Sequence, residues 1–81
     1  MSTSKSNFQK MAEKWRSPYV ARDRVAEFSG GILHPRTLAN LDSKGKGPKG
    51  RIRIGRKVAY DVIELCDWLA SKAEAVEQEA K

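Results

Sequence analysis

A run of positive charge between Lys44 and Lys57 is the part of this 81-residue sequence whose side chains most clearly suit binding chemistry. It contains no acidic residue, and its seven cations are Lys44, Lys46, Lys49, Arg51, Arg53, Arg56 and Lys57. Cations gathered in this way suit contact with a polyanion, whose counterions they displace. The alternative is a solvent-exposed edge hairpin whose charges only keep the protein soluble. Seven cations without an acid favour contact with a polyanion.

The segment just before this run places hydrogen-bonding side chains on one side of a predicted helix. In "HPRTLANLDSKG", Leu38 and Leu41 have the spacing of an inward face. The residues predicted to point outward and to contact a nucleic acid are His34, Arg36, Thr37, Asn40, Ser43 and Lys44. Arginine can form two hydrogen bonds with guanine, and asparagine two with adenine. Threonine and histidine can contact a phosphate or a thymine methyl group.

No combination of residues in the sequence suits catalysis or metal binding. His34 is the single histidine and Cys66 the single cysteine, and Cys66 is expected on the buried face of a different helix. Asp61, Glu64 and Asp67 are interpreted as a helix cap and a solvated helix face. We therefore expect no enzyme, and no catalytic, cofactor-binding or metal-binding residues.

An amphipathic helix is predicted near the N-terminus, from "SNFQKMAEKWR". Ser6 is expected as its N-cap, with Gln9 completing a capping box, and the helix should end at Ser17-Pro18. Its apolar residues share one face, and they are Phe8, Met11, Ala12 and Trp15. This stripe is expected to pack on the core, and the alternative is a face that binds a partner protein.

Two further helices are expected before the basic run. "YVARDRVAEFSGG" predicts one that is stopped by Gly30-Gly31, and Pro35 suits the first turn of the next, with His34 as an imperfect cap. Gly45 marks the end of that helix. Two short helices joined by a glycine-containing turn form a helix-turn-helix pattern.

The basic run itself predicts a β-hairpin, because "RIRI" and "KVAY" alternate around a Gly55-Arg56 turn. The side chains expected on the core side are Ile52, Ile54, Val58 and Tyr60. Those expected on the opposite, cationic side are Arg51, Arg53 and Lys57. The preceding "GKGPKG" is interpreted as a flexible basic loop. A last helix is then expected from an Asp61 N-cap, with its pattern weakening beyond Lys72 and a buried face of Val62, Leu65, Cys66 and Leu69.

Composition supports a single small domain with an anionic partner. The net charge is +6 and the pI about 9.8, which favours an anionic partner. One cysteine excludes an intrachain disulfide, and no apolar run approaches the length of a membrane span. The sequence also lacks the apolar core of a signal peptide, so we expect a cytoplasmic protein without membrane contact.

The predicted architecture is α+β and mostly helical, a winged helix-turn-helix with a two-stranded β-hairpin wing and an extra N-terminal helix. The expected divisions are an N-terminal helical arm over residues 1–18, the DNA-binding domain over 19–73 and an acidic tail over 74–81. One such module reads only a short site, so several copies are expected to act together. The acidic tail suggests head-to-tail self-association on DNA against a basic surface of the next molecule.

The order of motifs resembles the excisionase and AlpA-like small winged-helix proteins within the broader MerR-like group. The matching pieces are "VAE" (25–27), "RTL" (36–38), "GKGP" (45–48), "IGR-V-Y" (54–60) and "L--WL" (65–69). The resemblance covers about residues 19–70 and leaves out the N-terminal helix and the acidic tail. The turn "SGGILHP" is about two residues longer than the usual turn of the family.

The resemblance implies binding to double-stranded DNA in a mobile genetic element. Excisionases, or recombination directionality factors, bend DNA and steer an integrase toward excision, so an integrase is an expected partner. The alternative within the family is a transcriptional regulator of a prophage or integrative element. An alternative of another class is a small protein-interaction module, such as an antitoxin, that uses the stripe from Phe8 to Trp15. Duplex binding would weaken steeply with salt, whereas an apolar protein interface would not.

Overall fold

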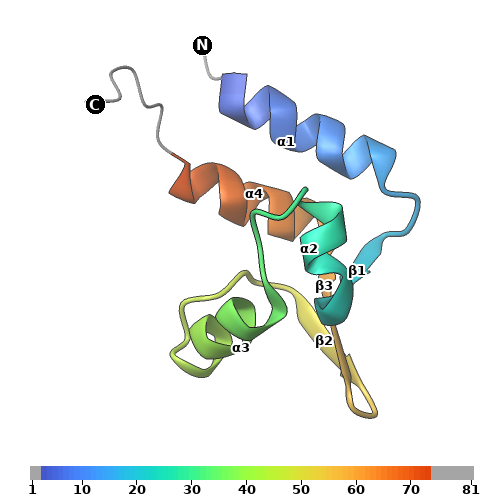
Figure 1. Cartoon of the computed structure of the whole chain (residues 1–81), viewed down its shortest axis with the longest axis vertical. Coiled ribbons are helices and arrows are strands. Elements are labelled where there is room, and N and C mark those ends of the chain that lie inside the picture. The colour runs from blue at the N-terminus through green and yellow to red at the C-terminus, as the bar shows by residue number, and fades with distance from the viewer. Residues whose placement is uncertain (1–2, 74–81) are drawn as a thin grey trace.

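The chain forms a small α+β fold in a computed structural model that describes residues 3–73 (Figure 1). In chain order its elements are α1 (Thr3–Lys14), β1 (Tyr19–Ala21), the 3-10 helix η1 (Arg22–Arg24), α2 (Val25–Phe28), α3 (Pro35–Ser43), β2 (Arg51–Ile54), β3 (Lys57–Asp61) and α4 (Val62–Lys72). The predicted acidic tail, 74–81, lies outside the described residues. The expected α+β class is thereby confirmed.

The sheet has three antiparallel strands in the order β1-β3-β2, where the sequence predicted two. The added strand is β1, which pairs Val20 with Tyr60 and Ala21 with Ala59 of β3. The helix predicted within "YVARDRVAEFSGG" is present as the short α2 (Val25–Phe28), but Ala21, which was expected on its buried face, lies in β1 instead. The helical spacing of Ala21, Val25 and Phe28 is real, but pairing with β3 buries Val20 completely, and this tertiary contact outweighs the local pattern.

The β2–β3 hairpin forms around the predicted Gly55-Arg56 turn, but its faces differ from the prediction. Arg51 lies opposite Tyr60 and Arg53 opposite Val58. Directly opposed residues share a face of the sheet, so both arginines lie on the face of the buried Tyr60. Because the turn has two residues, Ile52 lies opposite Ala59, and Ile52 is therefore on the other face from Val58 and Tyr60, contrary to the prediction.

Ile54 shows the consequence most clearly. It is 70% exposed and lies opposite Lys57, on the other face from the two arginines. The expectation that Ile54 anchors the hairpin to the core was therefore wrong, as was the grouping of Lys57 with Arg51 and Arg53.

The hydrophobic core joins the helices to one face of the sheet. Its buried residues are Val20, Val25, Phe28, Leu33, Leu38, Tyr60, Val62, Leu65, Cys66 and Leu69. Cys66 is a buried core residue as predicted, and burial, with a smaller effect from Asp67, raises the pKa of its thiol. The apolar stripe of α1 packs against this core and α4, and Trp15 meets Phe28 edge-on, with ring centroids 5.4 Å apart.

Local signals placed most helix ends correctly. The amide of Gly31 donates to the Ala26 carbonyl at the end of α2, and the Lys46 amide to the Leu41 carbonyl at the end of α3. Each is the long bond of a Schellman motif, made possible by Gly30 and Gly45 with positive φ.

Two N-cap predictions have opposite outcomes. Asp61 caps α4, because its carboxylate accepts from the amides of Ile63 and Glu64 at 2.9 and 3.1 Å. The predicted Ser6 cap was wrong, since α1 begins at Thr3 and contains Ser6. No helix among residues 3–73 is long and apolar enough to cross a bilayer.

Candidate nucleic-acid interface

The outward face of α3 carries the predicted contact residues. Pro35 occupies the first turn of the helix after His34, and Leu38 is buried, which turns the opposite side of the helix to solvent. The exposed residues on and beside that side are His34, Arg36, Thr37, Asn40, Ser43 and Lys44. All six predicted positions are therefore accessible, although the Ser43 hydroxyl donates to the Asn40 carbonyl at 2.8 Å.

The loop between α3 and β2 presents two exposed cations, Lys46 and Lys49. The loop lacks regular structure as predicted, but it is anchored at defined points. Pro48 is buried, and the indole Nε1 of Trp68 donates to the Lys46 carbonyl at 3.1 Å. These contacts hold the loop backbone against α4 while the lysine side chains reach solvent.

The hairpin distributes its four predicted cations over three places. Arg51 and Arg53 lie on the face toward α3, and Arg56 is exposed in the turn. Lys57 lies on the other face, where its Nζ is 2.8 Å from the Asp23 carboxylate. This pairing lowers the pKa of Asp23 and partly neutralises Lys57.

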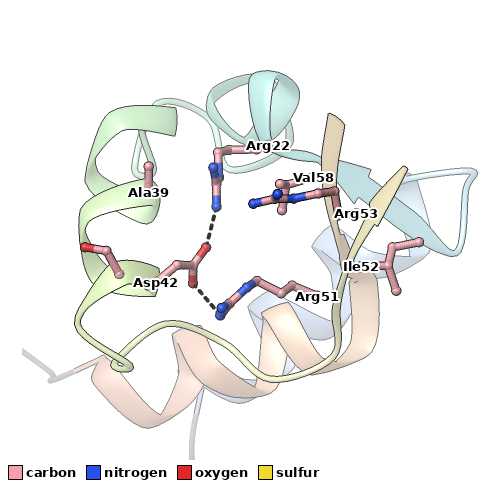
Figure 2. Close-up of a pocket in the computed structure, with 8 residues that line it drawn as sticks. Arg22, Ala39, Asp42, Arg51, Ile52, Arg53 and Val58 are labelled. Atoms are coloured by element: carbon pink, nitrogen blue, oxygen red, sulfur yellow. Dashed lines mark hydrogen bonds and ion pairs between the residues drawn. The ribbon is translucent and has the colours of Figure 1, made fainter. Parts of the chain in front are cut away.

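A groove of about 300 Å³ separates α3 from the hairpin (Figure 2). Its lining residues are Arg22, Ala39, Asp42, Ser43, Arg51, Ile52, Arg53 and Val58. The groove thus contains three arginines, from η1 and β2, and one carboxylate, from α3. The groove is predominantly cationic and lies beside the exposed face of α3.

Asp42 connects all the elements around this groove, and its side chain is only 5% exposed. Its Oδ2 accepts a hydrogen bond from the Tyr60 hydroxyl at 2.5 Å and another from the Arg22 guanidinium at 2.8 Å. Arg22 also donates through Nε to the Tyr60 oxygen at 3.0 Å. A buried carboxylate is stable only when it is paired and hydrogen-bonded, and these contacts meet that requirement for Oδ2.

The same network shifts two titrations. Burial raises the pKa of Tyr60, and the hydrogen bond to Asp42 acts in the same direction. The hydrogen bond to Tyr60 raises the pKa of Arg22. The phenol is therefore held neutral and the guanidinium charged.

Sequence reasoning missed Arg22, Asp42 and Tyr60 as a connected group. One signal for Asp42 was present, because it follows Leu38 by four residues and so shares the buried face of α3. The partners of Asp42 could not be found in this way, since Arg22 is 20 residues away and Tyr60 18 residues away in the chain.

Comparisons with family models, with curated proteins and with solved structures find no match for this chain.

Proposed function

We propose that this protein binds double-stranded DNA as a winged helix-turn-helix, with α3 as the recognition helix in the major groove and the β2–β3 hairpin as the wing. The observation that carries the proposal is the position of two features at one end of the molecule, away from α1 (Figure 1). These are the exposed polar face of α3 and the arginine-bearing face of the hairpin. A major groove about 12 Å wide admits one α-helix, and a cationic hairpin beside it suits the adjacent phosphates.

Within this proposal, some side chains of α3 contact base edges and others contact phosphates or the thymine methyl group. Arg36 and Asn40 are suited to guanine and adenine edges, since each can make two hydrogen bonds to its base. His34, Thr37 and Ser43 suit phosphates or the thymine methyl group. Cations of the loop and the hairpin contribute electrostatic affinity that does not depend on sequence.

The biological role that we propose is that of an excisionase, which arranges DNA for an integrase. The motif order from residue 25 to residue 69 supports this role, together with the exposed polar face of α3 beside the arginine-bearing face of the hairpin. A regulator of transcription would use the same face. The protein-interaction alternative relied on the stripe from Phe8 to Trp15, and that stripe packs against the protein's own core.

Base reading by α3 is tested with alanine variants. We expect Arg36→Ala and Asn40→Ala each to weaken binding at the preferred site by about 1–3 kcal/mol, with little change on random duplex DNA. Lys10→Ala and Gln9→Ala are matched controls, because these exposed residues lie on α1 at the other end of the molecule. Equal losses on specific and random DNA would exclude base reading by α3.

The two roles are separated by mapping binding sites across the host genome. Clustered direct repeats beside an attachment site, with loss of excision on deletion of the gene, support the excisionase. Sites that overlap promoters, with altered transcription and unchanged excision, support the regulator. An absence of duplex binding at low salt contradicts both roles.

A further inference from the structure

Two arginines of β2 look equivalent in the sequence but differ in their surroundings. Arg51 and Arg53 lie two residues apart on the same face of the hairpin. The Arg51 guanidinium is 3.4 Å from Oδ1 of Asp42. Arg53 pairs with no carboxylate among residues 3–73. Figure 2 shows Arg51 directed at Asp42 and Arg53 lying higher in the groove.

The two oxygens of the Asp42 carboxylate also differ. Oδ2 receives the hydrogen bonds from Tyr60 and Arg22, whereas Oδ1 is buried and receives none. At 3.4 Å the contact from Arg51 is an ion pair rather than a good hydrogen bond. Arg51 is therefore the cation that compensates the half of the carboxylate that Tyr60 and Arg22 leave unsatisfied.

The loop backbone at Gly47 passes directly over Oδ1 of Asp42. A Cβ atom on Gly47 would lie 1.9 Å from Oδ1 and 3.0 Å from Cγ of Asp42, so any side chain at position 47 would displace the carboxylate. The absence of a side chain at Gly47 thus allows the loop backbone to cover Asp42 without blocking the approach of Arg51.

On the basis of the proposed DNA binding, we propose that Asp42 withholds Arg51 from the DNA backbone. Arg51 is then a positioning residue that ties the hairpin to α3, and Arg53 is the phosphate-contacting arginine of β2. A phosphate that drew Arg51 away would leave Oδ1 of Asp42 buried without a compensating charge, which is unfavourable. The effect is on specificity, because phosphate contacts add affinity for every sequence equally.

The test compares the salt dependence of binding to a random duplex for matched variants. Each phosphate contact contributes about 0.9 to the slope of log K against log salt concentration. We expect Arg53→Ala to reduce the magnitude of the slope by about 1 and Arg51→Ala to leave it almost unchanged. Equal reductions by the two variants would overturn the proposal.

Asp42→Asn supplies the converse measurement. The amide oxygen can still accept from Tyr60 and Arg22, while the amide NH2 group in the place of Oδ1 repels Arg51. We expect the slope to steepen by about 1, the ratio of specific to random affinity to fall, and Arg51→Ala in this background to reverse the steepening. An unchanged slope in Asp42→Asn would contradict the proposal.

Melting temperatures of the free protein test the pairing of Asp42 with Arg51 independently of DNA binding. We expect Arg51→Ala to lower the melting temperature of the wild type but not of Asp42→Asn, whereas Arg53→Ala should have the same small effect in both backgrounds. Additive shifts for Asp42 and Arg51 would refute the pairing even in a protein that binds DNA. A coupled pair in a protein that binds no duplex would refute the proposed function instead, and with it the withholding of Arg51 from DNA.

Discussion

At the scale of single residues, the buried carboxylate of Asp42 beside the proposed DNA-binding face is the least expected feature of this protein. A basic groove would bind phosphate groups best if it contained no acidic residue. Asp42 instead uses its two oxygens differently, with Tyr60 and Arg22 on one and Arg51 near the other. The local balance of charge is therefore set by tertiary contacts and not by the number of cations in the sequence.

The Tyr60 hydroxyl gives this network a pH dependence. Its pKa is raised above the ordinary value of 10.0, first by burial and then by Asp42, so folding favours the protonated phenol. The resulting stability is fully present below pH 10 and is lost as the pH rises through the higher pKa of the folded state.

Tyr60→Phe tests this contribution. We expect the variant to lose about 1–3 kcal/mol of unfolding free energy at neutral pH, because Asp42 loses a buried hydrogen-bond donor. Above pH 10 the gap between wild type and variant should narrow, as urea titrations at several pH values would show. A gap that widens with rising pH would contradict the assigned direction of the pKa shift.

Ile54 tests the register of the hairpin. We expect Ile54→Asp to change the unfolding free energy by no more than about 0.5 kcal/mol, because the side chain is 70% exposed. Val20→Asp in the same sheet is the control, since Val20 is fully buried and the charge would have no partner. Thermal unfolding measures both, and a severe loss for Ile54→Asp would indicate that the core lies on the other face of β2.

At the scale of elements, the loop between α3 and β2 does more than connect them. Its backbone closes α3 through the Lys46 amide, meets α4 through Trp68 and covers Asp42 through Gly47. These contacts all lie at Lys46 and Gly47, so they hold the first part of the loop against both α3 and α4.

Gly47→Ala tests the covering contact. The new methyl group would overlap Oδ1 of Asp42, and we expect a loss of about 1–3 kcal/mol in unfolding free energy from overpacking. In an Asp42→Ala background the overlap is absent, so the same substitution should cost much less. Equal costs in the two backgrounds, measured by denaturant unfolding, would show that the strain lies elsewhere.

At the scale of the whole molecule, α1 lies at the end opposite to α3 and the hairpin, and α4 lies between them (Figure 1). α1 shields Phe28 and neighbouring core residues from solvent. Lys14, at the end of α1, and Arg16, which follows the helix, lie on one shared surface. This basic surface shares no lining residue with the groove between α3 and the hairpin. It is a candidate receptor for an acidic segment of a neighbouring molecule, such as the tail that lies outside the described residues.

Cooperative binding to tandem sites tests this assembly. We expect the full chain to bind DNA with two or three tandem sites more tightly per site than a single site, because open head-to-tail contacts add along the DNA. A chain ending at Ala73, and a full chain with Arg16→Glu, should lose this cooperativity while keeping single-site affinity. Independent filling of tandem sites by the full chain would contradict the assembly and leave DNA binding intact.

The sequence by itself determined the features that depend on near neighbours. Helix ends at Gly30 and Gly45, the Asp61 cap, the two-residue hairpin turn and the outward face of α3 were all predicted, because capping, positive φ and helical spacing act within a few residues. These signals were sufficient for the α+β class and for the accessible residues of the candidate interface.

Only the tertiary structure decided which face of each strand meets the core and which charges pair. β1 exists because Val20 packs beside Tyr60 of a distant strand, and the Asp42 network joins residues 18 to 38 positions apart. Such contacts leave no local pattern, since their stability comes from burial and charge compensation that arise only when remote segments meet. The separate roles of Arg51 and Arg53, identical in sequence pattern, follow from that same physical cause.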